Sequence, residues 1–114
     1  MKNIKEQFQS LILERRLSKR SLTDSFHQAL HIAGLEQDIE DLDSSSRLLS
    51  LVSEQLLSMI EQDGQEKFDK GAEPAYHNRQ HFADAVLALG FLLSQEKQFS
   101  VEQKRFLLLA MLVH

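Results

Sequence analysis

The chain has 114 residues, of which 42% are hydrophobic and 26% charged, and its net charge is -4. This is the composition of one globular domain and excludes a disordered chain. The chain has no cysteine, which excludes disulfides and thiolate metal sites, so any metal must be held by His, Asp or Glu. The lack of cysteine, of a signal peptide and of a membrane-length apolar run favours a soluble, cytoplasmic protein without membrane contact.

The charges are unevenly distributed along the chain. Residues 1–20 carry six Lys or Arg and two acidic residues, whereas residues 21–73 carry twelve acidic and three basic residues. We expect the two blocks to attract each other. A basic helix can bind nucleic acid, but this one has no groove-reading motif, so a solvated helix face is favoured and nucleic acid is not the expected partner.

One proline, four glycines and almost no alternation of apolar and polar residues predict an all-α bundle of about five helices. The first helix has one apolar stripe, formed by Ile4, Phe8, Leu11 and Ile12, and runs until the basic cluster at residues 15–20. The second begins at Ser21, a typical N-cap with Asp24 in the first turn, and ends at Gly34. Residues 36–43 are an acidic connection.

The third helix opens at residues 44–46 and is expected to end near Gly64, before a loop or short helix at residues 65–73. Its apolar stripe consists of Leu48, Leu49, Val52, Leu56, Met59 and Ile60. The stripe could form a groove for a partner, but a helix facing the core is favoured.

The fourth helix is expected from about Tyr76, after Pro74, and the fifth begins at Ser100, which forms a capping-box pattern with Gln103. Residues 106–113 are apolar nearly all round, which predicts a buried central helix. This helix lacks a stop signal, so we expect the chain to be a fragment. Two alternatives remain open: a partner that covers the helix, or a homo-oligomer that packs it across a two-fold axis.

The most informative segment is residues 76–84. His77 and His81 are four residues apart, so on a helix their imidazoles would share one face. Both could bind one metal, or one could bind metal while the other acts on a substrate, and the spacing does not choose. Asp84 is within reach to fix an imidazole tautomer. His114 ends an apolar run, where a buried histidine without a polar partner would be costly.

Other polar groupings have plainer interpretations. His27 and His31 have the same spacing but no motif nearby, and they alternate with core candidates, so we interpret them as surface or boundary residues. The acidic segment 36–43 lacks the order of a calcium loop. The sequence has neither a catalytic-triad motif nor a phosphate-binding glycine loop.

The string YHNRQHFADAV, followed by a helix ending LLLAMLVH, resembles the HD superfamily of metal-dependent phosphohydrolases, especially its cyclic-nucleotide phosphodiesterase-like branch. There, a YHNxxHxxDV stretch precedes a helix that ends in a His-Asp pair. The resemblance covers residues 74–114, whereas residues 1–73 resemble the family's leading helices only in being helical. It implies one HD-like domain, incomplete at the C-terminus: leading helices at 1–73 that pack on the core, and the start of the catalytic core at 74–114.

The resemblance also implies a role for each residue of the motif. It makes His77 the general acid, His81 and His114 metal ligands, Tyr76 and Asn78 pocket residues around His77, and Asp84 the motif's Asp. The chain has Phe82 and Ala85 where the family usually has Ala and Val, which are packing changes.

The carboxylates of such a site would follow His114. Two neutral imidazoles leave a hard divalent ion under-coordinated, so we expect the fragment to bind metal poorly and to be inactive. For the complete protein the resemblance implies a divalent ion (zinc, iron, manganese or magnesium) and hydrolysis of a small-molecule phosphate mono- or diester, with a nucleotide the natural guess. The alternative is a non-catalytic helical module for interaction or ligand sensing.

Overall fold

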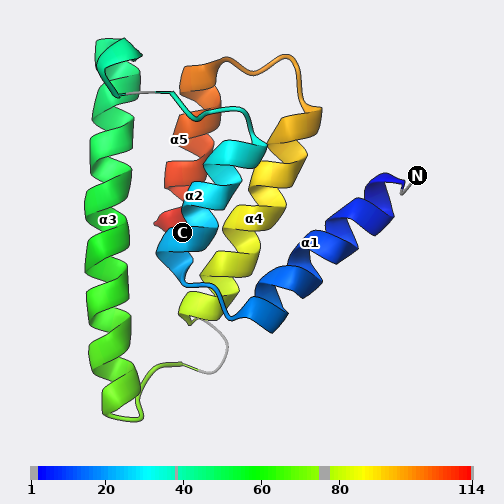
Figure 1. Cartoon of the computed structure of the whole chain (residues 1–114). Helices are drawn as coiled ribbons and strands as arrows, with labels where there is room; N and C mark the ends of the chain where they lie inside the picture. Colours follow the sequence, from blue (N-terminus) through cyan, green and yellow to red (C-terminus); the bar gives the residue numbers. More distant parts are fainter. Residues whose placement is uncertain (1–2, 38, 75–77, 114) are drawn as a thin grey trace.

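The computed structural model is an all-helical bundle (Figure 1) and describes residues 3–37, 39–74 and 78–113. These residues form five α-helices and one short 3₁₀ helix, which confirms the predicted fold class. The helices are α1 (Ile4–Ser18), α2 (Leu22–Ile32), α3 (Ser44–Asp69), α4 (Arg79–Gln95) and α5 (Val101–Leu112), with the 3₁₀ helix η1 at Ile39–Asp41. No helix within the described ranges is long and apolar enough to cross a membrane.

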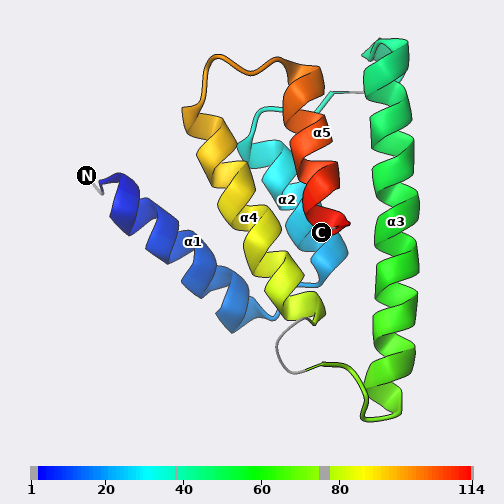
Figure 2. The ribbon, with the colours of Figure 1, turned by 180° about the vertical axis from the view of Figure 1, so that it is seen from behind.

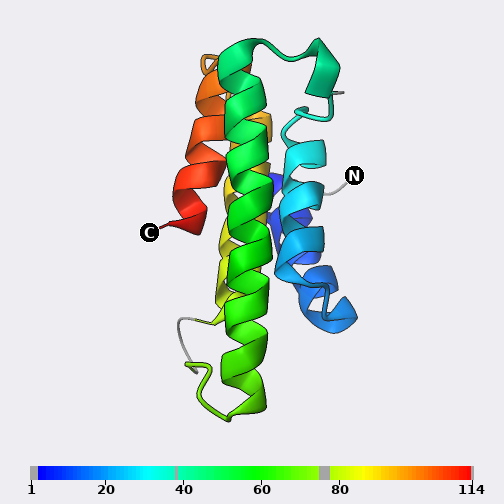
Figure 3. The same ribbon diagram turned by 90° about the vertical axis from the view of Figure 1, so that its left-hand side faces the viewer.

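Helix α4 occupies the centre of the arrangement and contacts the other four α-helices. Its main neighbour is α2, while α3 packs chiefly against α5, and α1 packs against α4 and then diverges from the bundle (Figures 1 and 2). Helix α3 is the longest, and its C-terminal end extends beyond the other helices (Figure 3). The largest fully buried apolar side chains are Phe26, Leu22, Leu57, Leu87, Leu108 and Val86.

The helix starts follow the predicted capping chemistry. The Ser21 hydroxyl accepts a hydrogen bond from the Asp24 amide at 3.1 Å, and Ser100 and Gln103 form the reciprocal capping box. Helix α3 begins at Ser44 as expected, with Asp43 as its N-cap. Each cap satisfies backbone N–H groups that have no partner within the helix. Local side-chain chemistry therefore sets where these helices begin.

The predicted end of the third helix near Gly64 is wrong, because α3 continues to Asp69. Gly64 has another role: a Cβ at this position would lie 2.5 Å from the Cδ of Arg79. The missing side chain gives room for the arginine to lie against the helix. The chain turns instead at Gly71, whose φ of +69° is in the left-handed region that glycine tolerates.

The prediction of a fully buried fifth helix is also wrong. Helix α5 lies at the edge of the bundle against α3 and α4, and Phe106 and Val113 are exposed. Its buried face includes Arg105, whose Nη2 donates to the Leu35 carbonyl oxygen at 2.6 Å. Although the residues of this helix are apolar on nearly all faces, other helices of the bundle cover only part of it.

Helices α2 and α4 approach closely at Gly90. A Cβ there would lie 2.8 Å from the Cβ of Ala29 and 2.9 Å from its carbonyl oxygen. These distances are shorter than a van der Waals contact, so only glycine fits without movement of the α2 backbone. This contact fixes the distance of α4 from the core helix α2.

Candidate functional site

The start of α4 positions His81, the motif histidine that lies within the described residues. Helix α4 begins at Arg79, later than the predicted start near Tyr76, because Asn78 adopts an extended conformation and acts as the N-cap. The Asn78 Oδ1 accepts a hydrogen bond from the His81 backbone amide at 2.9 Å. His81 therefore lies in the first turn, partly buried.

Three predicted site residues, Tyr76, His77 and His114, lie outside the described residues. The expectation that His77 and His81 share one helical face, and the roles of the three residues, stay predictions. The described neighbours of Tyr76 and His77 are the N-cap residue Asn78 on one side and Pro74 on the other.

Arg79 ties the start of α4 to the preceding segment. Its Nε donates to Glu73 Oε2 at 2.8 Å, and Glu61 of α3 lies 3.9 Å from its Nη1. The Arg79 guanidinium lowers the pKa of the Glu73 carboxyl below its ordinary value by hydrogen bonding to it. The arginine thus joins α3, the connection before α4 and the first residue of α4.

Asp84, the residue predicted to orient an imidazole, is bound by two arginines of α1. Its Oδ1 accepts from Arg15 Nε at 2.8 Å, and its Oδ2 accepts from Arg16 Nε at 3.1 Å. Each carboxylate oxygen is thus engaged by a charged donor, which is the stronger class of hydrogen bond. The predicted role of Asp84 beside an imidazole stays a prediction.

Arg15 is the buried member of this cluster, with 3% of its side chain exposed. Its Nη1 donates to Gln80 Oε1 at 2.5 Å and to the Arg20 carbonyl oxygen at 3.4 Å. A buried guanidinium needs such partners because desolvation of an unpaired charge is costly. The interpretation of the basic cluster as a solvated helix face is wrong for Arg15, which anchors α1 to α4.

The sequence contains a signal for the burial of Arg15. Arg15 follows Leu11 by four residues and Ile12 by three, so it continues the apolar stripe of the first helix. Its partner Asp84 lies outside the acidic block at residues 21–73, to which the basic block was expected to be attracted.

A surface hollow of about 320 Å³ lies between α1 and α4 beside this cluster. We call it the α1–α4 hollow. Its polar lining consists of Arg16, His81 and Asp84, and its apolar lining includes Phe8 and Ile12. The site thus combines a histidine, an arginine–carboxylate cluster and an apolar wall.

The described residues do not by themselves fit a divalent metal ion. Among them, no group of three or more His, Asp or Glu side chains lies close enough to hold one, and Asp84 already binds two arginines. The metal predicted from the resemblance therefore stays a prediction, and it needs ligands outside the described part of the chain.

The second histidine pair is bound to glutamates at the surface. His27 Nε2 lies 2.7 Å from Glu54 Oε1, and His31 Nδ1 lies 2.8 Å from Glu36 Oε2. All four side chains are exposed. The interpretation of His27 and His31 as surface residues is confirmed.

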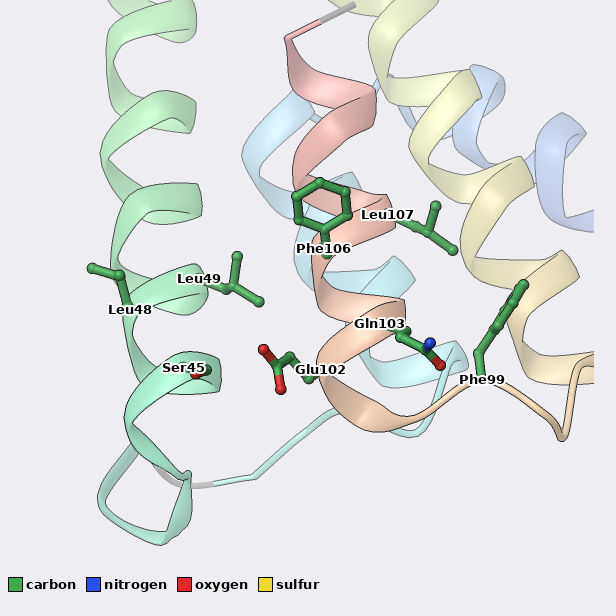
Figure 4. A pocket seen from close by; sticks show the side chains of 8 residues that line it. All are labelled: Ser45, Leu48, Leu49, Phe99, Glu102, Gln103, Phe106 and Leu107. Carbon is green, nitrogen blue, oxygen red and sulfur yellow. The ribbon is translucent and has the colours of Figure 1, made fainter.

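A larger depression, of about 640 Å³, runs between α3 and α5. This α3–α5 groove has Leu49 of α3 on one side and Phe106 of α5 on the other (Figure 4). Its apolar lining residues are Leu48, Leu49, Phe99, Phe106 and Leu107. The interpretation of the α3 stripe as core is wrong for its outer positions, because Leu48, Val52 and Met59 are exposed.

No protein family model, curated protein or solved structure matches this chain. The resemblance to HD-type phosphohydrolases therefore rests on the motif residues alone.

Proposed function

We propose that this chain forms part of an HD-type metal-dependent phosphohydrolase. Its substrate is a small phosphate mono- or diester, and a nucleotide is the favoured one. The observation that carries the proposal is the hydrogen bond from the His81 amide to the Asn78 side chain, 2.9 Å long. It gives the Asn of the motif a physical role, because the cap fixes the backbone of the proposed metal ligand in the first turn of α4.

The arrangement of α4 and α5 supports the same proposal. The two helices are antiparallel neighbours, so α5 runs back toward the end of the bundle at which α4 starts (Figure 2). The resemblance requires His81, in the first turn of α4, to approach His114, which follows α5 in the chain. An antiparallel pair is the arrangement that allows this approach.

The residues of this chain would orient the site and not complete it. Asn78 holds the backbone of His81, and Arg79 fixes the connection before α4 through Glu73. The described residues do not supply the carboxylates that a divalent ion needs. The resemblance places these acidic ligands beyond His114, so the proposal requires them there.

The first test is to read the gene immediately after the codon for His114. An Asp codon in a continuing frame is expected, and a stop codon would end the proposal. The protein of the complete reading frame should then hydrolyse bis(p-nitrophenyl) phosphate or cyclic nucleotides when a divalent metal is added. Replacing His77 or His81 by Ala should abolish turnover, while His31→Ala, in a surface histidine of the same chain, should leave it unchanged.

A second candidate function, a self-associating helical module, is favoured by the α3–α5 groove. The exposed side chains of Leu48, Val52 and Met59 lie on one stripe of α3 together with Gln55, at the spacing of a coiled-coil seam. Phe106 and Phe99, which are also exposed, extend this apolar surface onto α5 and the connection before it. A standard interface buries about 800 Å² per partner.

A second copy of the chain is the occupant that we propose for this surface. The exposed Phe106 ring borders the groove, so a two-fold axis could bring each ring to the groove of the other copy. Sedimentation velocity should show concentration-dependent association that Phe106→Glu removes. Leu17→Glu, in the equally exposed but distant α1, should keep it. A chain that stays monomeric at millimolar concentration would reject this candidate.

A further inference from the structure

The α1–α4 hollow carries an excess of positive charge. Arg15 and Arg16 both bind Asp84, so two guanidinium groups face one carboxylate. Arg15 is buried and its charge is balanced by Asp84, whereas the Arg16 side chain is 63% exposed. Among the described residues, the cluster therefore has one positive charge in excess, and Arg16 lines the hollow. Such a surface favours an anionic ligand.

Arg16 is also placed to donate to a ligand. It uses its Nε for Asp84 at 3.1 Å, which holds the guanidinium plane at the edge of the hollow. A guanidinium has five N–H donors, so its two terminal nitrogens supply four more. Arginine binds phosphate through such paired donors more specifically than lysine does.

The other wall of the hollow belongs to the first turns of α4. His81 lines it from the first turn, where the backbone dipoles of a helix favour a negative charge. An imidazole N–H can donate a hydrogen bond to a phosphate oxygen. The histidine and Arg16 thus stand on two different helices that border one space.

The rest of the lining is apolar. Phe8 and Ile12 come from α1, and Ala85 and Ala88 from α4. A hydrated inorganic ion would gain nothing from these side chains, whereas a compact apolar or aromatic group would bury its surface against them. The lining matches a molecule with an anionic end and an apolar end.

We propose that the α1–α4 hollow is a binding site for a phosphate ester, in which Arg16 binds the phosphate group, the apolar wall holds the organic group and the His81 side chain borders the bound phosphate. Arg15 acts as a positioning residue, because it neutralises Asp84 and holds α1 against Gln80 and Asp84, which flank His81 in α4. The inference deepens the proposed function, and the identification of the ligand as a substrate rests on it.

The test is an NMR titration of the isotope-labelled chain with phenyl phosphate, inorganic phosphate and phenol. Phenyl phosphate should shift the signals of the His81 ring, the Arg16 Nε–H and the Ala85 methyl group together. Inorganic phosphate should shift only the first two, and phenol should bind more weakly than phenyl phosphate. Unchanged His81 and Arg16 signals at millimolar phenyl phosphate would overturn the proposal.

Variants decide whether Arg16 is responsible. Arg16→Gln should weaken phenyl phosphate binding about tenfold, as expected for the loss of a charge-assisted contact, and Arg16→Lys should retain part of it. The matched control is Arg20→Gln, because Arg20 lies on the same basic segment but binds Glu14 and Gln28. Equal weakening by the Arg16→Gln and Arg20→Gln variants would mean non-specific attraction and would overturn the assignment.

These outcomes are separate from those of the proposed function. The titration needs neither metal nor turnover, so phosphate binding can be present in a chain whose gene stops after His114. Conversely, hydrolysis by the complete protein with normal kinetics in the Arg16→Gln variant would leave the phosphohydrolase standing and remove this subsite.

Discussion

The ion pair between Arg15 and Asp84 should respond differently to loss of either partner. Arg15 is 3% exposed and Asp84 is 24% exposed. Asp84→Ala leaves a buried guanidinium with only the uncharged oxygens of Gln80 and Arg20 as partners. Arg15→Met leaves Asp84 partly solvated and still paired with Arg16 at 3.1 Å. The aspartate substitution should therefore be the more damaging one.

The size of each effect follows from which charge remains buried. Removing one partner of a buried pair costs about 3–5 kcal/mol when the other charge stays uncompensated, so we expect about 3 kcal/mol for Asp84→Ala. For Arg15→Met we expect about 1–2 kcal/mol, because the methionine keeps much of the packing and no buried charge remains. Arg16→Ala should cost less than about 1 kcal/mol, since exposed pairs contribute little.

Urea unfolding followed by circular dichroism measures these free energies. The double variant Arg15→Met with Asp84→Ala supplies the decisive comparison, because it leaves no buried charge. It should be more stable than Asp84→Ala alone. The reasoning would be refuted if Asp84→Ala and Arg16→Ala had equal effects, or if the double variant lost the sum of its two single effects.

Two further substitutions test packing and charge. Gly90→Ala should destabilise the fold by about 1–3 kcal/mol despite the higher helix propensity of alanine, because its Cβ would meet Ala29, including its backbone; Gly64→Ala should cost less, since it meets only the movable Arg79 side chain. Urea unfolding compares the two, and equal losses would contradict the argument. Glu73→Gln should make the free energy of unfolding less dependent on pH in acid. The Arg79 contact lowers the pKa of Glu73. The stabilisation that this contact provides is therefore present above the ordinary glutamate pKa and disappears as pH falls through the lower folded-state value. Unfolding curves for the variant and the parent that shift in parallel with pH would refute this.

The parts of the fold that were predictable from the sequence depend on residues close together in the chain. Ser21 and Ser100 cap helices through amides within three residues, so the sequence contains both partners of each hydrogen bond. Gly64 shows the opposite case. A glycine has the same sequence signature whether it ends a helix or admits a neighbouring side chain, and here the deciding neighbour, Arg79, comes from another helix.

The same distinction divides the candidate site. Asn78 and His81 are three residues apart, so their capping contact follows from a local pattern. The contact between Arg15 and Asp84 joins residues separated by 69 positions, and periodicity on one helix can indicate that Arg15 is buried without naming its partner. The predicted full burial of α5 was wrong for a related reason. An apolar sequence shows that a helix can be buried, but it does not show whether other helices cover all of its faces.

The two surfaces that we associate with function lie on opposite sides of the molecule, and this makes them separable. Helix α1 lies on one side of the α2–α4 pair and α3 on the other (Figure 1). A second copy on the α3–α5 groove would therefore leave the α1–α4 hollow open. Phosphate-ester binding should have the same affinity in the Phe106→Glu variant as in the parent chain, and association should be unchanged by Arg16→Gln. Loss of both properties in either single variant would mean that α4, which contacts both sides, couples the two surfaces.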